Sequence, residues 1–189
     1  MTQQGKNAID LVLAESLIEL SAKKPIDKIT IKEITDKAGV IRPTFYNHFQ
    51  DKYELIDWII NTELLEPIKP LLNAGMIFEA TVLMLNNITA NSVFYKKALK
   101  LEGAVTFNQI AMKCVYEMFM NIISEKSTGK KSKYRWLTPE VISTYYAQSL
   151  CFITEGWIAQ GMDDIEPKEM SEAYMYLITR SMDDILSEL

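Results

Sequence analysis

The sequence predicts an all-α protein in two parts: an N-terminal three-helix head that contains a helix-turn-helix, and a larger C-terminal helical bundle. Apolar residues recur at helical spacing through most of the 189 residues, and Thr-, Asp- and Pro-based start signals precede these segments. The apolar–polar alternation typical of a half-buried strand is not found in any segment. We therefore expect helices joined by short turns and no sheet.

The first two helices of the head have clear limits. Apolar and small residues spaced along one face predict the first helix over residues 6–23, ended by Pro25; they are Ile9, Val12, Leu13, Ser16, Leu17 and Leu20. Thr30 and Glu33 form a capping-box pattern, which starts the second helix. Gly39 ends that helix, because glycine adopts the left-handed conformation at low steric cost.

A third helix is predicted over residues 42–49, with Pro43 tolerated in its first turn. Phe45 and Phe49 are four residues apart and are expected to face inward. Asp51 repeats a helix-start pattern and opens a fourth helix.

Pro67, Pro70 and Gly75 follow the fourth helix and predict a domain junction, with the helix ending near Pro67. We expect the head to occupy residues 1–65 and an effector-binding and dimerisation domain to occupy residues 66–189. The second domain is expected to contain helices at about 76–88, 92–101, 104–125, 138–160 and 167–188, with a basic loop at 126–137.

Composition narrows the class of protein. The chain is 48% hydrophobic and 24% charged, which is ordinary for a soluble globular protein. A polar N-terminus and the lack of a long apolar run indicate neither a signal peptide nor a membrane span, so a cytoplasmic location is expected. Cys114 and Cys151 lie in apolar segments and are expected to be buried free thiols rather than a disulfide or redox pair.

The net charge of −5 argues weakly against nucleic-acid binding, but residues 20–52 carry seven cations against four anions, a local +3. The cations are Lys23, Lys24, Lys28, Lys32, Lys37, Arg42 and Lys52; the anions are Asp27, Glu33, Asp36 and Asp51. A phosphate-binding face needs local positive charge rather than a basic whole protein.

A helix-turn-helix at residues 30–52 is a device for placing one helix in the DNA major groove. Arg42 suits a bidentate contact to guanine, and Thr44 can contact a phosphate or a thymine methyl. Tyr46 and Asn47 project from the same short helix. Lys52 at a helix start favours a phosphate partner. An ordinary bundle explains Phe45 and Phe49 but not this polar face.

His48 is the only histidine, so a metal site or a histidine-based catalytic centre has little support, and we expect no metal, no cofactor and no enzymatic activity. A DNA-facing role is favoured for His48 instead.

The segment resembles the TetR/AcrR family of bacterial transcriptional regulators. The resemblance rests on Gly39-Val40, on Pro43-Thr44-Phe45-Tyr46-Asn47-His48-Phe49 and on Asp51-Lys52-Tyr53-Glu54-Leu55, and it covers roughly residues 8–60. It implies DNA contacts, mostly to phosphates, with the surroundings of Arg42 reading bases. The implied contact set is Thr30, Lys32, Arg42, Pro43, Thr44, Tyr46, Asn47, His48 and Lys52. Ile41 replaces the frequent Ser or Thr of this turn, which removes a helix cap.

The C-terminal part resembles the subgroup of dihydroxyacetone kinase operon regulators in its closing pattern Gly156-Trp157, Gly161-Met162 and Pro167. Met and aromatic residues can line adaptable apolar pockets. The side chains expected nearest the centre of this domain are the candidates for an effector pocket: Met84, Phe107, Met118, Tyr145 and Trp157.

The last two predicted helices are apolar over a wide arc, which requires two packing partners. The second partner is expected to be the same pair in another subunit, giving a four-helix bundle and a homodimer on a palindromic operator. The basic loop residues Lys126, Lys130, Lys131, Lys133 and Arg135 favour a solvated loop over a site for DNA or acidic partners.

The function expected is therefore a dimeric repressor of transcription, controlled by a small-molecule effector. The alternative is a regulator or co-activator controlled by a protein partner. An enclosed apolar pocket favours the first, whereas a filled body with an exposed apolar patch favours the second. An enzyme is disfavoured.

Overall fold

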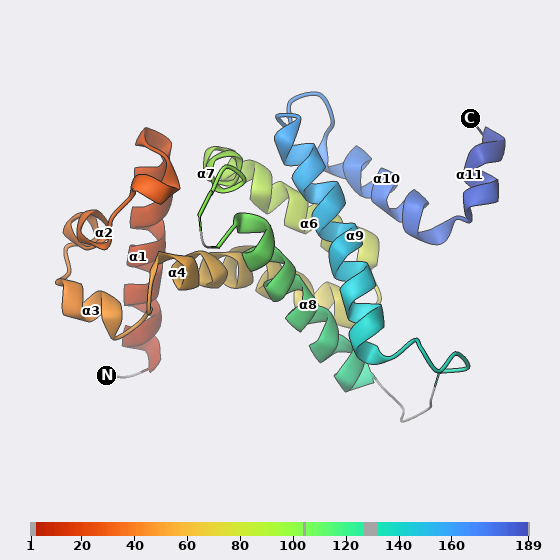
Figure 1. Cartoon of the computed structure of the whole chain (residues 1–189), viewed down its shortest axis with the longest axis horizontal. Helices are drawn as coiled ribbons and strands as arrows, with labels where there is room; N and C mark the ends of the chain where they lie inside the picture. The colour runs from red at the N-terminus through yellow and green to blue at the C-terminus, as the bar shows by residue number, and fades with distance from the viewer. Residues whose placement is uncertain (1–2, 104, 127–131, 189) are drawn as a thin grey trace.

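The computed structural model describes residues 3–103, 105–126 and 132–188, and the regular structure in these ranges is entirely helical (Figure 1). The head, with the N-terminus, lies at one end of the molecule, and the C-terminus lies at the other end of the larger body. The predicted all-α architecture is confirmed.

The head consists of α1 (Gln3–Lys23), a short 3-10 turn η1 (Ile26–Lys28), α2 (Ile31–Ala38) and α3 (Arg42–Tyr46). Its core is formed by side chains that are fully buried or nearly so: Leu13, Leu17, Ile26, Ile34, Phe45 and Phe49. Val12 departs from the predicted inward face of α1 and is 41% exposed. The third helix is shorter than predicted, because the chain turns at Asn47 and His48.

The predicted capping box of α2 is present. The backbone N–H of Glu33 donates to the Thr30 hydroxyl, and the Glu33 carboxylate accepts from the backbone N–H of Thr30 at 2.9 Å. A hydrogen bond from Lys24, together with those from Thr30, lowers the pKa of Glu33 to about 2. Gly39 ends the helix with a φ of 68°, the conformation for which glycine was expected.

One continuous helical rod joins the head to the body. It comprises α4 (Lys52–Ile59), a π-helical segment η2 (Ile60–Leu65) and α5 (Glu66–Asn73). The predicted end near Pro67 is wrong, because Pro67 lies within the continuous rod directly after the π-helical segment, and the carbonyl of Glu63, four residues before it, accepts instead from the Asn87 amide at 2.9 Å. The break comes at Gly75, whose φ is 79°. The boundary expected between residues 65 and 66 thus falls inside a helix, and the division into domains stays a prediction.

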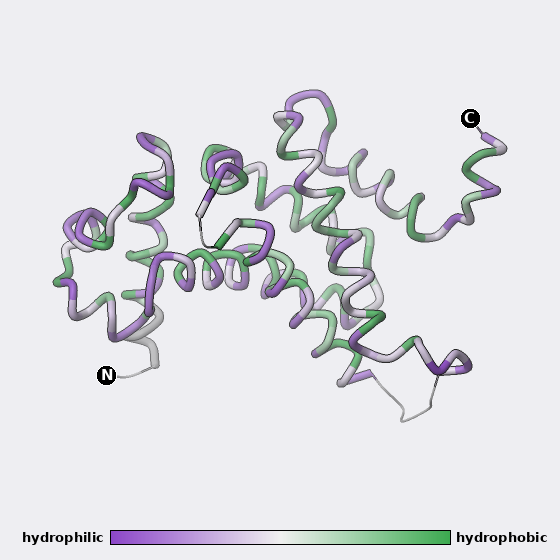
Figure 2. Tube along the Cα trace, in the orientation of Figure 1, coloured by the Kyte–Doolittle hydropathy of each residue, from purple (hydrophilic) through white to green (hydrophobic). Residues whose placement is uncertain are grey.

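The body is built from α6 (Ile77–Ala90), α7 (Ser92–Ala98), α8 (Phe107–Lys126), α9 (Pro139–Ala159), α10 (Pro167–Thr179) and α11 (Met182–Glu188). Helix α8 packs along α9, and α10 packs mainly across α6 (Figure 1). The hydrophilic turn between α9 and α10 stands out in the hydropathy of the chain (Figure 2). Within the described ranges, none of the helices has the length and apolar character needed to cross a membrane.

The predicted final helix over residues 167–188 is in fact two helices. Arg180 is extended, with φ −105° and ψ 150°, and ends α10. Ser181 then caps α11, because its hydroxyl accepts from the backbone N–H of Asp184 at 3.2 Å while the Asp184 carboxylate accepts from the backbone N–H of Ser181. This local capping box separates the two helices.

Both cysteines are buried free thiols, as predicted. Burial raises the pKa of Cys114 and of Cys151 to about 12. Both side chains therefore remain neutral at physiological pH and pack as small apolar groups.

The Asp51 cap of α4 makes a direct stability prediction. The Asp51 carboxylate accepts from the backbone N–H groups of Tyr53 at 2.8 Å and Glu54 at 2.9 Å. Asp51→Ala should lower the free energy of unfolding by about 1 kcal/mol, measured by urea denaturation. Asp51→Asn keeps an acceptor and should retain most of the stability. Equal stability of the two variants would contradict this role for the cap.

Candidate nucleic-acid interface

Helix α3 has a polar outer face that is exposed and an apolar inner face that is buried. Phe45 is fully buried against the head core, and Phe49 is 4% exposed. The exposed face comprises Arg42, Pro43, Tyr46 and Asn47, with Thr44 half-buried beside them. Buried aromatic side chains thus fix the orientation of the helix, while its polar groups remain available to a partner.

The start of α3 behaves as the sequence predicted. Ile41 makes no side-chain cap hydrogen bond and is 68% exposed. The Arg42 guanidinium donates to the Tyr46 hydroxyl at 3.4 Å, one helical turn away. Arg42 forms no ion pair with any residue that the structure describes, so its charge is available for a base or a phosphate.

Much of the local positive charge is balanced within the head. Lys24 pairs with Glu33 at 2.5 Å, Lys32 pairs with Asp36 at 2.7 Å, and Lys37 pairs with Glu19. The Lys32 pair lies on the surface of α2, and its hydrogen bond raises the pKa of Lys32. Exposed pairs of this kind are weak, so Lys32 can exchange its partner for a phosphate at little cost.

Thr30 is exposed at the start of α2 and serves first as its cap. Its hydroxyl also donates to the Glu33 carboxylate at 2.8 Å. A DNA contact from Thr30 stays a prediction and would share this hydroxyl with the cap.

His48 does not face outward, contrary to the expectation from sequence. Its side chain is 2% exposed, and its Nδ1 lies 2.6 Å from the carboxylate of Asp10, whose side chain is 8% exposed. The turn after α3 directs the imidazole toward α1, where a buried acceptor is available. The pair joins α3 to α1 across 38 positions of sequence and so helps to position α3, and a DNA contact by His48 stays a prediction.

Lys52 also departs from its expected role. Its ammonium group donates to the backbone carbonyls of Ile26, Asp27 and Ile29 at 3.0, 2.7 and 3.2 Å. Burial lowers the pKa of Lys52. These carbonyls lie in and directly after the 3-10 turn that follows α1, so Lys52 supplies them with a donor, and its phosphate contact stays a prediction.

The rod is held on the body by a polar contact. Lys113 of α8 pairs with Asp57 of α4 at 2.9 Å, and the Asn61 amide donates to the Asp57 carboxylate at 2.9 Å. The same amide lies 3.4 Å from the Cys114 sulfur. These contacts tie α8 to α4, the helix that carries the head.

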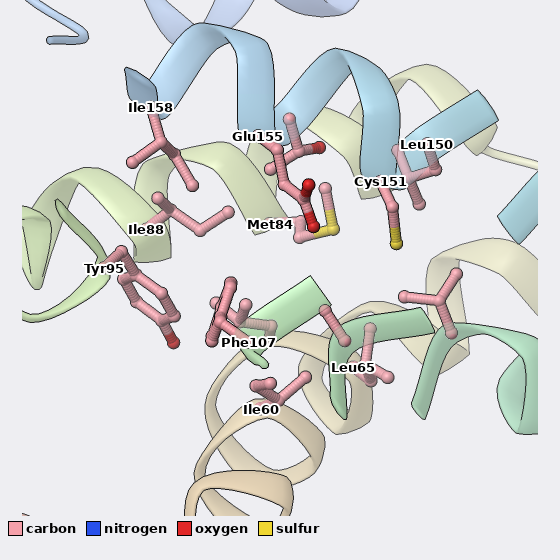
Figure 3. A pocket seen from close by; sticks show the side chains of 14 residues that line it. Ile60, Leu65, Met84, Ile88, Tyr95, Phe107, Leu150, Cys151, Glu155 and Ile158 are labelled. Carbon is pink, nitrogen blue, oxygen red and sulfur yellow. The ribbon is translucent and has the colours of Figure 1, made fainter. Parts of the chain in front are cut away.

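The body contains a cavity of about 40 Å³ between η2, α6, α7, α8 and α9 (Figure 3). Met84 and Phe107, two of the predicted effector residues, line it. Met118 lines a neighbouring apolar groove of about 400 Å³ bordered by α5, α6, α8, α9 and α10, to which Met84 also contributes.

The other two predicted effector residues lie elsewhere. Tyr145 is 63% exposed on the outer face of α9, where it packs edge-on against Tyr146. Trp157 is 2% exposed, and its indole N–H donates to the carbonyl of Ile165 at 2.9 Å, closing the turn after α9. Apolar periodicity could not show which apolar residues of α9 border the cavity and which lie at the surface or in the turn that follows. Tyr95, Thr154 and Glu155 line the cavity and were missed, because their roles depend on which helices enclose it.

The Lys52 contacts predict a structural role that can be separated from phosphate binding. Lys52→Ala should lower the free energy of unfolding by about 1–3 kcal/mol, because three carbonyls lose a charged donor. Lys28→Ala is the matched control, since its side chain is 75% exposed and only pairs with Asp27. It should change stability by less than about 0.5 kcal/mol. Unchanged stability of Lys52→Ala with a shallower salt dependence of DNA binding would instead establish the phosphate contact.

Comparisons with known proteins agree with this geometry. Residues 15–58 match the model described as "Bacterial regulatory proteins, tetR family", and residues 76–180 match "Transcriptional regulator C-terminal region". The chain is 26% identical over 152 residues to the HTH-type dhaKLM operon transcriptional activator DhaS of Lactococcus lactis subsp. lactis (strain IL1403), covering 79% of each chain.

Two solved structures share the fold. The dihydroxyacetone kinase operon activator DhaS has a TM-score of 0.59 at 20% identity, with 95% of each chain covered. NalD, the secondary repressor of the MexAB-OprM multidrug efflux pump in Pseudomonas aeruginosa, has a TM-score of 0.59 at 12% identity, covering 92% of this chain and 96% of NalD. With its head and body both matched, the chain belongs to the TetR family and is a DNA-binding transcriptional regulator.

Proposed function

We propose that this regulator acts as a homodimer, binds a palindromic operator through α3 of each subunit, and is controlled by an effector in its body. The observation that carries the proposal is the exposed Arg42–Tyr46–Asn47 face held on the buried Phe45. A face of this kind fits the major groove, where an arginine can bind guanine with two hydrogen bonds. Thr44 and Lys32 supply phosphate contacts at its edge.

Dimerisation is supported by unpartnered apolar side chains on the last helices. Phe152 is 78% exposed and lies two turns beyond Tyr145 on α9, and Leu177 of α10 is 49% exposed. Aromatic and aliphatic groups of this size gain most from burial in an interface. A two-fold axis through this surface would pair two heads for a palindromic site.

Control by an effector is supported by the rod and its contact with α8. A ligand that binds one arrangement of the body more tightly than another shifts the population of head positions. Coupling free energies of about 1–3 kcal/mol correspond to about 5–150-fold changes in DNA affinity. The 40 Å³ cavity lies beside η2, so a ligand there would act directly on the rod.

The direction of control that we propose is repression, in which the dimer occupies a promoter until the effector releases it. Activation is the second candidate, favoured by the similarity to the transcriptional activator of Lactococcus lactis. Transcription in vitro from a template that carries the operator separates the two: repression predicts less transcript with added protein, and activation predicts more.

The effector is proposed to be a small molecule. A protein partner is the second candidate, favoured by the exposed aromatic residues before and on α9, Tyr134, Trp136 and Tyr145. Loss of control after Trp136→Ser, with unchanged DNA affinity, would favour the protein partner.

Base reading by Arg42 gives a sharp prediction. Arg42→Ala should cost about 1–3 kcal/mol at one base pair of each half-site and relax the preference there, measured by fluorescence anisotropy on single-base operator variants. Tyr46→Phe is the comparison, because loss of a phosphate contact weakens binding to every variant equally. Uniform losses for Arg42→Ala would show that it reads no base.

The dimer surface predicts the effect of a charge at its centre. Phe152→Glu should convert a dimer into a monomer at micromolar concentration in sedimentation velocity, because burying an unpaired carboxylate is costly. Val93→Glu, at an apolar position of α7 that is 53% exposed, should remain dimeric. A wild-type monomer, or a Phe152→Glu dimer, would contradict this surface.

A further inference from the structure

The rod that joins the head to the body (Figure 1) changes its hydrogen-bonding pattern at η2. The backbone N–H of Glu66 donates to the carbonyl of Asn61, five positions earlier, as in a π-helix. The next residue is Pro67, which has no N–H and whose ring, in a regular α-helix, clashes with the carbonyl four positions before it. That carbonyl belongs to Glu63. The wider π-helical turn therefore relieves the clash, and the Glu63 carbonyl needs a donor other than the missing N–H of residue 67.

The donor comes from α6 of the body. The Asn87 side-chain amide donates to the Glu63 carbonyl at 2.9 Å. The Asn91 amide, one helical turn further along the chain, donates to the Glu63 carboxylate at 3.0 Å. All three residues are half-buried. One residue of the rod is thus held through its backbone and through its side chain by two amides of the body.

The identity of this donor matters for the position of the rod. A water molecule would satisfy a half-exposed carbonyl nearly as well as a protein group does. Water, however, would leave the rod free to shift against α6, whereas an amide on a short side chain of α6 keeps the two helices in one register. The bond from Asn87 therefore attaches the rod to the body at the turn from which α4 extends to the head.

We infer that Asn87 is a positioning residue for the DNA-reading helix: it supplies the donor that Pro67 removes, and it thereby fixes the direction in which α4 leaves the body. Proline at position 67 makes an outside donor necessary, and Asn87 makes that donor part of α6. The two residues act as one device, although they lie on different helices and 20 positions apart in sequence.

The head follows the direction of α4. Leu55 and Ile56 of α4 are fully buried, and α1 packs against α4. Helix α3 lies on the side of the head away from the body (Figure 1), so a small rotation at η2 becomes a larger displacement at α3. In a dimer, the same direction sets the separation of the two α3 helices and hence the half-site spacing that is bound. This last consequence rests on the proposed function.

A double-mutant cycle tests whether Asn87 replaces the N–H that Pro67 lacks. Asn87→Ala should lower the Tm of the full chain by about 2–4 °C, because the Glu63 carbonyl loses its donor. In the Pro67→Ala background, residue 67 carries its own N–H, so Asn87→Ala should change the Tm by less than about 1 °C. Asn86→Ala, at an exposed position of the same helix, is the matched control and should leave the Tm unchanged. An unchanged Tm for Asn87→Ala, or equal losses in both backgrounds, would overturn the inference.

The position of the head is measured separately from stability, by double electron–electron resonance. Spin labels attached at Lys28→Cys in the head and Glu125→Cys on α8 report a head-to-body distance, because both positions are exposed. The native Cys114 and Cys151 are buried and do not take up the label. Labelled chains diluted with excess unlabelled chain give intramolecular distances, whatever the oligomeric state.

Wild type and Asn86→Ala should give the same narrow distance distribution. Asn87→Ala and the double variant Pro67→Ala/Asn87→Ala should give a shifted or broader one, because the rod is no longer attached to α6. The double variant is decisive, since it is expected to lose the attachment without the loss of stability that Asn87→Ala causes alone. A distribution in the double variant that matches wild type would overturn the positioning role.

Binding to DNA separates this inference from the proposed function. Fluorescence anisotropy compares a palindromic operator with a duplex that carries a single half-site. The double variant should bind the single half-site as wild type does, because its head is unaltered, and should bind the palindrome at least about 5-fold more weakly. Equal weakening on both duplexes, or unchanged affinity for the palindrome, would overturn the inference. If wild type binds neither duplex selectively, the proposed function fails, whereas the distances and the double-mutant cycle still decide the role of Asn87.

Discussion

The continuous rod from Lys52 to Asn73 is the constraint on which the rest of the structure depends. Its apolar side chains enter the core of the head at one end and the core of the body at the other. They are Leu55, Ile56, Ile59, Ile60, Leu64, Leu65 and Ile68. Because both parts pack on one helix, the orientation of α3 is tied to the packing of α8 and α9. The π-helical turn lies where the two parts meet, a position at which such turns often serve function.

Most of the polar residues that were predicted to contact DNA make hydrogen bonds within the head. Lys52 closes the chain after α1, and the His48–Asp10 pair ties the end of α3 to α1. Thr30 caps α2. On the outer face of α3, Arg42 has no ion-pair partner in the described chain and donates only to the exposed Tyr46 hydroxyl. The candidate interface is therefore a small set of exposed residues on α3, supported by a larger set of residues that position this helix.

Local signals predicted most of the fold. Capping residues at Thr30, Asp51 and Thr138 and the left-handed Gly39 begin or end helices where expected. The errors arose where tertiary packing overrides a local signal. Pro67 predicts the end of a helix, yet the rod continues, because its buried residues pack in the core of the head and in the core of the body. The residues around Arg180 predict a continuous helix, but Arg180 is extended and Ser181 caps a new helix, α11.

The candidate site was predictable only in part, for the same reason. The motif identified α3 and its exposed face, but residue type alone could not show that His48 finds a buried carboxylate 38 positions earlier. The cavity residues Tyr95, Thr154 and Glu155 come from separate helices. Their proximity depends on how α7 and α9 pack, which periodicity does not encode.

Hydroxyl-radical footprinting of the protein on DNA from upstream of its own gene tests the central claim most directly. A dimer that reads DNA through α3 predicts two symmetric protected segments, separated by about one helical turn or a multiple of it. A scrambled duplex should show no discrete protection. A single protected segment, or uniform protection of both duplexes, would contradict sequence reading by paired α3 helices.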